Sequence, residues 1–133
     1  NSHQIIRGYE KLRKILIVDD KNIVRDLLTA TLKDKNFEIL SASTGCEAIE
    51  IARKEKPSLM FLDVMMPEMD GFEVCEKLKT DDNTKDIYII VLTSINREKE
   101  REIAFKAGAD DYLTKPFRPL DILKKMEEFF SDI

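Results

Sequence analysis

Five polar residues of this chain stand where short apolar runs end, and together they could carry out phosphoryl chemistry beside a metal ion. They are Asp19, Asp20, Asp63, Thr93 and Lys115. Mg²⁺ prefers oxygen ligands and keeps several waters, so two or three protein oxygens suffice to bind it. An aspartate can also attack phosphorus and form an acyl phosphate. The set therefore indicates a Mg²⁺ ion beside a phosphorylatable aspartate, if the fold brings the five groups together.

A lysine and a hydroxyl would complete this chemistry. Phosphoryl transfer depends mostly on positioning and charge neutralisation. Lys115 would supply a positive charge for the phosphoryl group, and the Thr93 hydroxyl would donate to the modified state. Each residue alone has a plainer explanation, since aspartates and threonines that follow strands often cap turns or helices. Their combination at four strand ends favours a site.

Apolar runs predict the strands that would position these residues. The predicted strands are residues 14–18, 37–42, 59–62, 87–92 and 112–114. The first, third and fourth are continuously apolar rather than alternating, which is typical of parallel strands covered on both faces. Because ligands bind at the carboxyl ends of such strands, all five polar residues would meet at one edge.

Helical periodicity occupies the intervals between the strands. The predicted helices are about 21–35, 44–56, 72–78, 97–107 and a segment after Pro119. In the first helix the apolar stripe is predicted at Ile23, Leu27, Ala30 and Thr31, widened by Val24, Leu28 and Leu32. Strands that alternate with helices through right-handed crossovers give a doubly wound α/β sheet.

Composition restricts the class of protein further. The 133 residues suffice for one domain with a normal core. No apolar run approaches the roughly 20 residues of a membrane span, and the net charge of -4 argues against nucleic-acid binding by this domain. Cys46 and Cys75 lack C-x-x-C spacing, so we predict reduced, partly buried thiols. Residues 1–12, with the single histidine His3, are interpreted as a tail, a linker or a cloning remnant before a domain at 13–133.

Four segments resemble the receiver domain of two-component response regulators. They read ILIVDD at 15–20, LDVMMPEMDG at 62–71, VLTS at 91–94 and GADDYLTKPF at 108–117. The second and fourth are specific, and the order and spacing of all four fit the family. The resemblance covers residues 14 to about 131. It implies a flavodoxin-like five-stranded parallel sheet of order 2-1-3-4-5, with helices on both faces.

The resemblance also implies a role for each site residue. Asp63 would be the phosphoacceptor. Mg²⁺, or alternatively Mn²⁺, would be held by the carboxylates of Asp19, Asp20 and Asp63 and by the backbone carbonyl of Met65.

The phosphoryl group would be contacted by two further residues, Thr93 and Lys115. By the same resemblance, Tyr112 would act with Thr93 as an aromatic switch, and the Lys115–Pro116 bond would be cis. An X-Pro bond permits this at modest cost.

The function that the resemblance implies is a cytoplasmic signalling switch rather than an enzyme. A sensor histidine kinase or a histidine phosphotransfer protein would supply the phosphoryl group. The surface of the fourth helix, fifth strand and fifth helix would then change and control an output partner, with a homodimer through that surface as one option. No direct nucleic-acid or membrane binding is expected. The chain would be either a single-domain regulator or the receiver of a longer protein.

Two apolar residues invite a hypothesis about the lifetime of the phosphorylated state. Met65 lies two residues after Asp63, and Ile95 lies two residues after Thr93. Apolar groups there cannot orient a water for attack on an acyl phosphate, so we expect slow self-dephosphorylation. Simple packing of both side chains over the loop is the alternative.

Three other classes of protein fit the sequence less well. A haloacid-dehalogenase-type phosphatase needs an Asp-x-Asp pair, but Asp63 is followed by Val64 and Met65, and the chain has little room for a cap. A nucleotide or flavin module would need G-x-G-x-x-G or a P-loop, and the chain has only four glycines. A purely structural interaction module has no use for an acid pair beside a lysine, and loss of metal binding would favour it.

Overall fold

Five parallel strands form one sheet in the order β2-β1-β3-β4-β5. The computed structural model describes residues 13–94 and 98–130. The strands are β1 (Arg13–Val18), β2 (Phe37–Ala42), β3 (Leu59–Asp63), β4 (Tyr88–Thr93) and β5 (Asp111–Thr114). The predicted fold class and strand order are confirmed, and Asp63 and Thr93 are the last residues of their strands.

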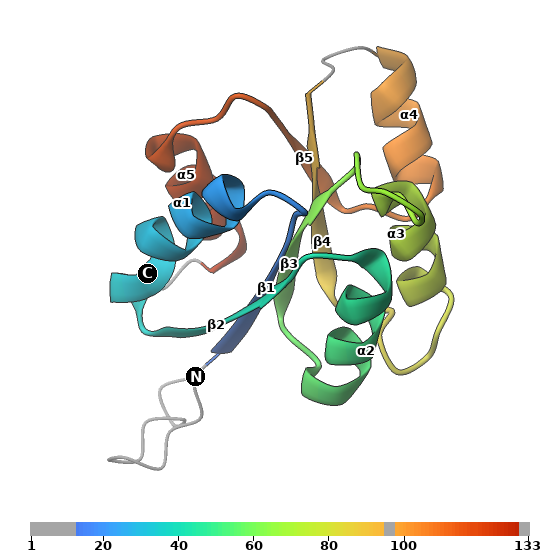
Figure 1. The fold of residues 1–133 in the computed structure, drawn as a ribbon, viewed down its shortest axis with the longest axis horizontal. Helices are drawn as coiled ribbons and strands as arrows, with labels where there is room; N and C mark the ends of the chain where they lie inside the picture. The colour runs from blue at the N-terminus through green and yellow to red at the C-terminus, as the bar shows by residue number, and fades with distance from the viewer. Residues whose placement is uncertain (1–12, 95–97, 131–133) are drawn as a thin grey trace.

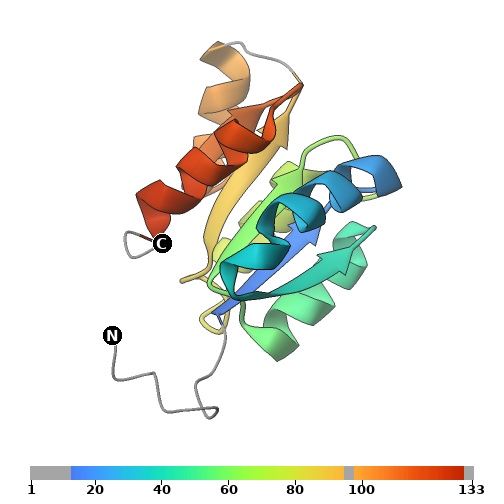
Figure 2. The same ribbon diagram turned by 90° about the vertical axis from the view of Figure 1, so that its left-hand side faces the viewer.

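Helices cover both faces of this sheet, as predicted. They are α1 (Asn22–Leu32), α2 (Gly45–Glu55), α3 (Gly71–Lys79), α4 (Glu98–Lys106) and α5 (Pro119–Phe129). Figure 1 shows α1 and α5 on one side of the sheet and α2, α3 and α4 on the other, and Figure 2 gives the face with α1 and α5. Each face has its own apolar cluster, and β3 is buried along its whole length.

Local sequence signals account for where several helices begin and end. The side chain of Thr44 accepts from the backbone N–H of Glu47 and caps α2, while Asp70 caps α3 in the same way. Gly108 follows α4 with a φ of +101°, a conformation that suits glycine. Pro119 is the first residue of α5, where its missing N–H costs nothing.

The first helix differs from the prediction in length and in its buried face. It ends at Leu32 and continues as a short 3₁₀ turn. Leu28 and Leu32 are fully buried, whereas Ile23 is 81% exposed and Ala30 is also exposed. Leu28 and Leu32 are four residues apart, so they lie one above the other on the same face of α1. Because both are buried, this is the face that packs against the sheet. The predicted centre of the stripe was therefore wrong.

Two further expectations concern the membrane and the N-terminus. Within the described ranges, the helices are too short and too polar to cross a bilayer. Residues 1–12, including His3, and Ile95 lie outside the described residues. The interpretation of the N-terminal segment as a tail or linker, and the domain start at 13, stay predictions.

Candidate functional site

Three aspartates meet at the carboxyl edge of the two central strands. Val18 of β1 pairs with Leu62 of β3, so the residues that follow them are neighbours. Asp19, Asp20 and Asp63 each offer one carboxylate oxygen, and these oxygens lie within 4.8 Å of one another. Asp19 and Asp63 are 0% and 1% exposed, whereas Asp20 is open to solvent. The predicted acidic cluster is therefore present.

Lys115 reaches this cluster from the far end of the chain. Its Nζ lies 2.9 Å from Asp19 Oδ2 and 3.0 Å from Asp63 Oδ1. Its backbone N–H donates to the carbonyl of Thr93 at 2.7 Å, which ties the loop after β5 to the end of β4. The Lys115–Pro116 peptide bond is cis, as predicted.

Burial and charge determine how these groups ionise. Burial raises the pKa of Asp63, the hydrogen bond from Lys115 opposes that rise, and the charge of Asp19 adds to it. Burial lowers the pKa of Lys115, but its hydrogen bonds to Asp19 and Asp63 outweigh this, and the net shift is upward. The lysine is therefore charged, and its single ammonium group pairs with the two buried carboxylates of the cluster.

One carboxylate oxygen of the cluster shows that a cation would fit. Asp63 Oδ2 is buried and has no hydrogen-bond partner within the part of the chain that the structure describes. Buried polar atoms are almost always partnered, so such an atom needs an explanation. An all-oxygen set of carboxylates suits a hard cation such as Mg²⁺. The residues present therefore match the requirement of the predicted ion.

The loop after β3 packs closely against the strand end. The backbone N–H of Met65 lies 3.4 Å from Asp63 Oδ1, and the Met65 side chain is 63% exposed. Gly71 donates to the carbonyl of Val64 at 2.9 Å, and a Cβ on Gly71 would lie 2.2 Å from the carbonyl oxygen of Asp63. Position 71 therefore requires glycine for this loop to fold over the site.

Thr93 and Tyr112 belong to β4 and β5, which follow β3 in the order of the sheet. Thr93 ends β4, is 7% exposed and pairs with Thr114. Tyr112 precedes Thr114 by two residues and so shares its face of the sheet, the face that α4 covers. The Arg101 guanidinium is 4.7 Å from the centre of the Tyr112 ring, and the Phe105 ring meets it edge-on at 6.3 Å. Tyr112 is thus held against α4.

Two residues of this region were missed by reasoning from the sequence. The close approach of Gly71 to Asp63 could have been suspected from the Asp-Gly pair that opens α3. Arg25 had no such signal, because nothing in a helical pattern shows that its guanidinium turns back to the carbonyl of Asp19 at 2.7 Å.

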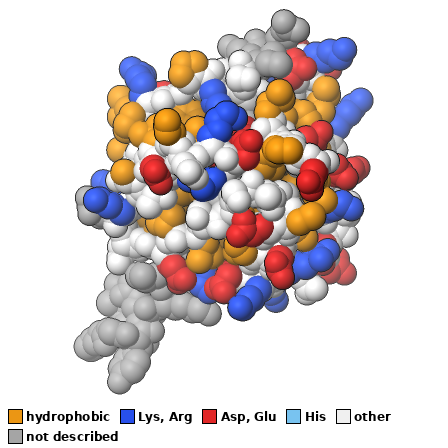
Figure 3. Space-filling model, viewed as in Figure 1, with side chains coloured by type: hydrophobic (Ala, Val, Ile, Leu, Met, Phe, Trp, Pro, Cys, Tyr) orange, Lys and Arg blue, Asp and Glu red, His pale blue; other side chains and the backbone are white. Residues whose placement is uncertain are grey.

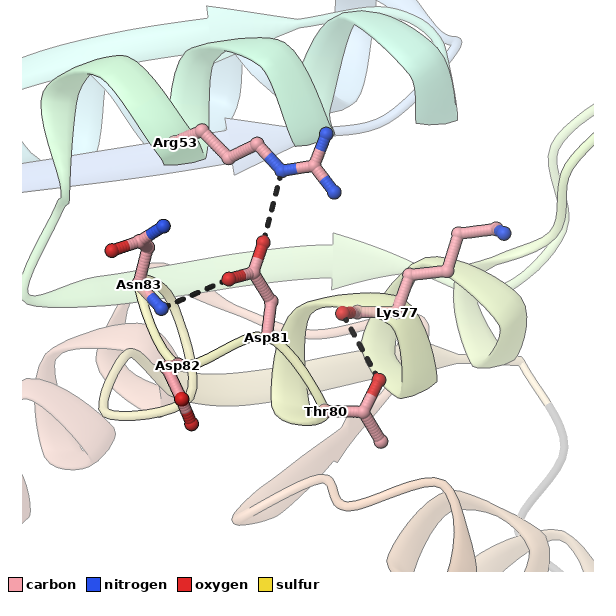
Figure 4. Close-up of a pocket in the computed structure, with 6 residues that line it drawn as sticks. All are labelled: Arg53, Lys77, Thr80, Asp81, Asp82 and Asn83. Carbon is pink, nitrogen blue, oxygen red and sulfur yellow. Dashed lines mark hydrogen bonds and ion pairs between the residues drawn. The ribbon is translucent and has the colours of Figure 1, made fainter.

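A hollow lies at the edge of the sheet opposite the acidic cluster, where α2 and α3 end. Figure 4 shows the residues that line it: Arg53, Lys77, Thr80, Asp81, Asp82 and Asn83. Arg53 pairs with Asp81 at 3.0 Å, and the backbone N–H of Asn83 donates to the same carboxylate at 2.9 Å. Arg53 and Asp81 are already paired with each other, and most of the lining side chains are exposed. This hollow is therefore a control region for variants of the carboxyl edge.

Comparison with known proteins identifies the class of fold and then the family. The structure superposes on the Vibrio cholerae chemotaxis protein CheY4 with a TM-score of 0.84 and 31% identity, covering 89% of this chain and 98% of that one. The sheet order and helix arrangement are those of CheY-like, flavodoxin-fold domains. Residues 15–127 match the response regulator receiver domain. The chain belongs to this family, which is part of two-component signalling.

The curated relatives that the chain matches are longer transcriptional regulators. It is 44% identical over 109 residues to the probable transcriptional regulator ycf27 of Porphyra purpurea, which covers 82% of this chain and 44% of that protein. It is 40% identical over 111 residues to the Bacillus subtilis alkaline phosphatase synthesis transcriptional regulatory protein PhoP, covering 83% and 45%. The chain therefore spans less than half the length of these relatives.

Proposed function

We propose that this chain is a phosphorylation-dependent switch in which Asp63 accepts a phosphoryl group from a histidine kinase or a histidine phosphotransfer protein. The observation that carries the proposal is the environment of Asp63. Its carboxylate is 1% exposed, Oδ1 accepts from Lys115 at 3.0 Å, and Oδ2 has no partner among the described residues. Membership of a regulatory family supports a switch rather than a turnover enzyme.

Phosphoryl transfer follows from the position of this carboxylate. One oxygen of Asp63 would attack phosphorus, and an O–P bond would form while the bond from phosphorus to the donor imidazole nitrogen breaks. The electron pair of the broken bond stays on the imidazole. Lys115 would remain on the other oxygen and offset negative charge. Attack requires that Asp63 is ionised. Burial raises the pKa of Asp63, and the hydrogen bond from Lys115 opposes that rise and so favours the ionised form.

Asp19, Asp20 and Asp63 would hold Mg²⁺ or Mn²⁺, with the backbone carbonyl of Met65 as a further ligand. The clustered carboxylate oxygens and the unpartnered Asp63 Oδ2 support this assignment. When bound, the ion supplies charge neutralisation at the phosphoryl oxygens.

Thr93 and Tyr112 would transmit the change in Asp63 to the surface. The Thr93 hydroxyl would donate to the phosphoryl group. Tyr112 would leave its contacts with Arg101 and Phe105 and move toward Thr93. Because both of those contacts come from α4, the surface of α4, β5 and α5 would change with the ring.

The partners of the proposed switch follow from this surface. The donor would approach the carboxyl edge, and an output partner or a second copy of the chain would bind α4, β5 and α5. On the face in Figure 3, acidic and basic side chains are interspersed. This supports the absence of direct nucleic-acid binding there, because such binding uses clustered positive charge. A cytoplasmic location, where the donor kinase would present its phosphohistidine, completes the proposal.

The mass of the intact chain tests the central step. The wild-type chain, Asp63→Asn and the control Asp82→Asn are incubated with MgCl₂ and a small acyl-phosphate donor. Asp82 is a matched control because its side chain is 95% exposed at the opposite edge. One Mg²⁺-dependent phosphoryl adduct on the wild type and on Asp82→Asn, absent from Asp63→Asn, is expected. An adduct that persists in Asp63→Asn would refute the assignment.

Met65 offers a second test within the same proposal. Its exposed side chain adjoins Asp63 and cannot orient an attacking water. Met65→Asn and Ile95→Glu should therefore shorten the lifetime of the phosphorylated state, measured by the decay of the adduct after the donor is removed. Unchanged decay in both variants would contradict the hypothesis and favour simple packing.

A further inference from the structure

We infer that Arg25 is a positioning residue for the turn that carries Asp19 and Asp20, and therefore for the Mg²⁺ site of the proposed function, on which this inference rests. Arg25 Nη1 donates to the main-chain carbonyl of Asp19 at 2.7 Å. Its Nη2 donates to the side chain of Asn22. These two contacts hold the guanidinium between the end of β1 and the first turn of α1.

Every polar group of Asp19 has a hydrogen-bond partner. Its N–H donates to the carbonyl of Ala42 at 3.2 Å, Oδ1 accepts from the N–H of Lys21 at 2.9 Å, and Oδ2 accepts from Lys115 at 2.9 Å. Its carbonyl accepts from Arg25. Since Asp19 is 0% exposed, loss of Arg25 would leave that carbonyl buried without this partner. Such a group costs free energy, so the peptide would rotate toward another donor.

This carbonyl belongs to the peptide plane that leads into Asp20. A peptide unit is rigid and planar, so rotation of the Asp19 carbonyl also moves the N and Cα atoms of Asp20. Within the described ranges, the Asp20 carboxylate has one ion pair, to Lys21 at 3.4 Å. An exposed pair of this kind contributes little. The direction of the Asp20 carboxylate therefore depends on the backbone that Arg25 fixes.

The N-cap residue of α1, Lys21, contributes no side-chain hydrogen bond of its own to the first turn of the helix, whereas Thr44 and Asp70 cap α2 and α3. The planar fork of an arginine reaches two acceptors at once, and a lysine offers a single nitrogen. Arg25→Lys thus keeps the positive charge and loses the two-point hold, which separates positioning from electrostatics.

Isothermal titration of the full chain with MgCl₂ tests the inference. Arg25→Ala and Arg25→Lys should both raise the dissociation constant for Mg²⁺ by about tenfold or more, as loss of an outer-shell support does at other metal sites. Asn22→Ala, which frees one arm of the guanidinium, should raise it by a smaller factor. Arg53→Ala is the matched control, since Arg53 pairs with Asp81 at the opposite edge, and it should bind as the wild type does.

A kinetic measurement separates weaker metal binding from damaged chemistry. With a small acyl-phosphate donor, Arg25→Ala should form the adduct slowly at low MgCl₂ and approach the wild-type rate at saturating MgCl₂. A merely structural role would lower the rate at all concentrations. If Arg25→Ala does not fold, Arg25→Lys and Asn22→Ala carry the comparison.

The outcomes distinguish this inference from the proposed function. A wild-type dissociation constant in Arg25→Ala, or full restoration by Arg25→Lys, would overturn the positioning role alone. A wild-type chain that binds Mg²⁺ but forms no adduct with the donor or with a phosphorylated histidine kinase would overturn the proposed function alone. A wild-type chain that binds no Mg²⁺ would overturn both.

Discussion

Two mostly buried lysines, at opposite edges of the same sheet, form contrasting networks. The side chains of Lys115 and Lys79 are 18% and 16% exposed. Lys115, at the carboxyl edge, meets the two buried carboxylates of Asp19 and Asp63. Lys79, at the end of α3, meets one carboxylate, Asp110, at 2.7 Å. The lysine at the carboxyl edge therefore pairs with two carboxylates, and the lysine at the other edge pairs with one.

The partners of Lys79 complete its hydrogen bonds. Its ammonium also donates to the carbonyls of Lys85 at 3.1 Å and Ile87 at 2.6 Å. Asp110 Oδ2 in turn accepts from the backbone N–H of Ile89 at 2.8 Å. An ammonium has three protons, and all three have acceptors here. This closed network holds the loops before β4 and β5 together and has no need of a further ion.

Burial of a lysine beside a carboxylate therefore does not by itself indicate a functional site. What differs is the balance of charge and of hydrogen bonds. At the carboxyl edge an oxygen of Asp63 has no partner among the described residues, and two buried carboxylates share one ammonium. Such an imbalance favours a bound cation, because buried charges are otherwise paired.

The largest loss of stability is expected at the edge that holds Lys79 and Asp110, where the charges are balanced. Lys79→Met should lower the free energy of unfolding by about 3 kcal/mol or more, because it leaves Asp110 and two carbonyls without their donor. MgCl₂ should not restore the loss. Chemical denaturation with and without MgCl₂ measures both quantities, and recovery with the ion would contradict the contrast between the two edges.

The next largest loss of stability is expected at the carboxyl edge. Lys115→Met leaves Asp19 and Asp63 without their ion-pair partner, but Asp63, whose pKa burial raises, can take up a proton, so the loss should be smaller, about 2 kcal/mol in EDTA. MgCl₂ should recover most of it, because a cation can replace the lysine charge. Denaturation curves in EDTA and in MgCl₂ are the measurement, and a loss that the ion does not relieve would count against a cation site.

Exchange of aspartate for asparagine should change the stability of the fold in opposite directions at the two edges. Asp110→Asn loses a charge-assisted bond to Lys79 and should cost about 1 kcal/mol or more. Asp63→Asn removes a buried charge, so it should raise the melting temperature of the metal-free protein at neutral pH.

The pH dependence of Asp63→Asn follows from the raised pKa of Asp63, which burial causes. Ionised Asp63 destabilises the fold, and this penalty is absent below the unfolded-state pKa and grows as the pH rises through the folded-state pKa. The advantage of Asp63→Asn should therefore disappear as the pH falls below about 4. Melting temperatures in EDTA across that range test this, and an advantage that persists in acid would contradict it.

The smallest effect is expected on the rates at which the two cysteines are alkylated. Burial raises the pKa of Cys75 to about 12, with Lys79 opposing and Asp110 adding to the shift. Cys46 is exposed, so the prediction of a partly buried thiol was wrong for it. An alkylating reagent should modify Cys46 within the native protein and Cys75 only as the fold opens. Peptide masses over time give both rates, and Lys79→Met should raise the rate at Cys75.

Most of the fold could be predicted because the strong signals are local. Continuous apolar strands, Thr44, Asp70 and Pro119 each act on their own neighbourhood, and the elements that they mark are present. The failure at α1 has the opposite cause. Ile23 and Leu28 are equally apolar, and only the packing of α1 against the sheet and α5 decides that Leu28 is buried and Ile23 is 81% exposed.

The candidate site was predictable to the extent that it depends on strand ends. Asp19, Asp20 and Asp63 lie together because β1 and β3 are neighbours and parallel, and Lys115 joins them from the end of β5. The supports of the site were not predictable. Arg25 reaches back to a backbone carbonyl, and such a contact depends on the path of a turn rather than on a residue pattern.

The ion pair between Asp19 and Lys115 joins residues 96 positions apart and has a consequence for biosynthesis. A ribosome releases the acid pair well before the lysine, so a growing chain first carries the carboxylates without their ammonium partner. The carboxyl edge is complete only after β5 has joined the sheet. Competence for the proposed reaction would therefore begin only once the residues through β5 have been made and have folded, so chains interrupted before β5 would take no part in signalling.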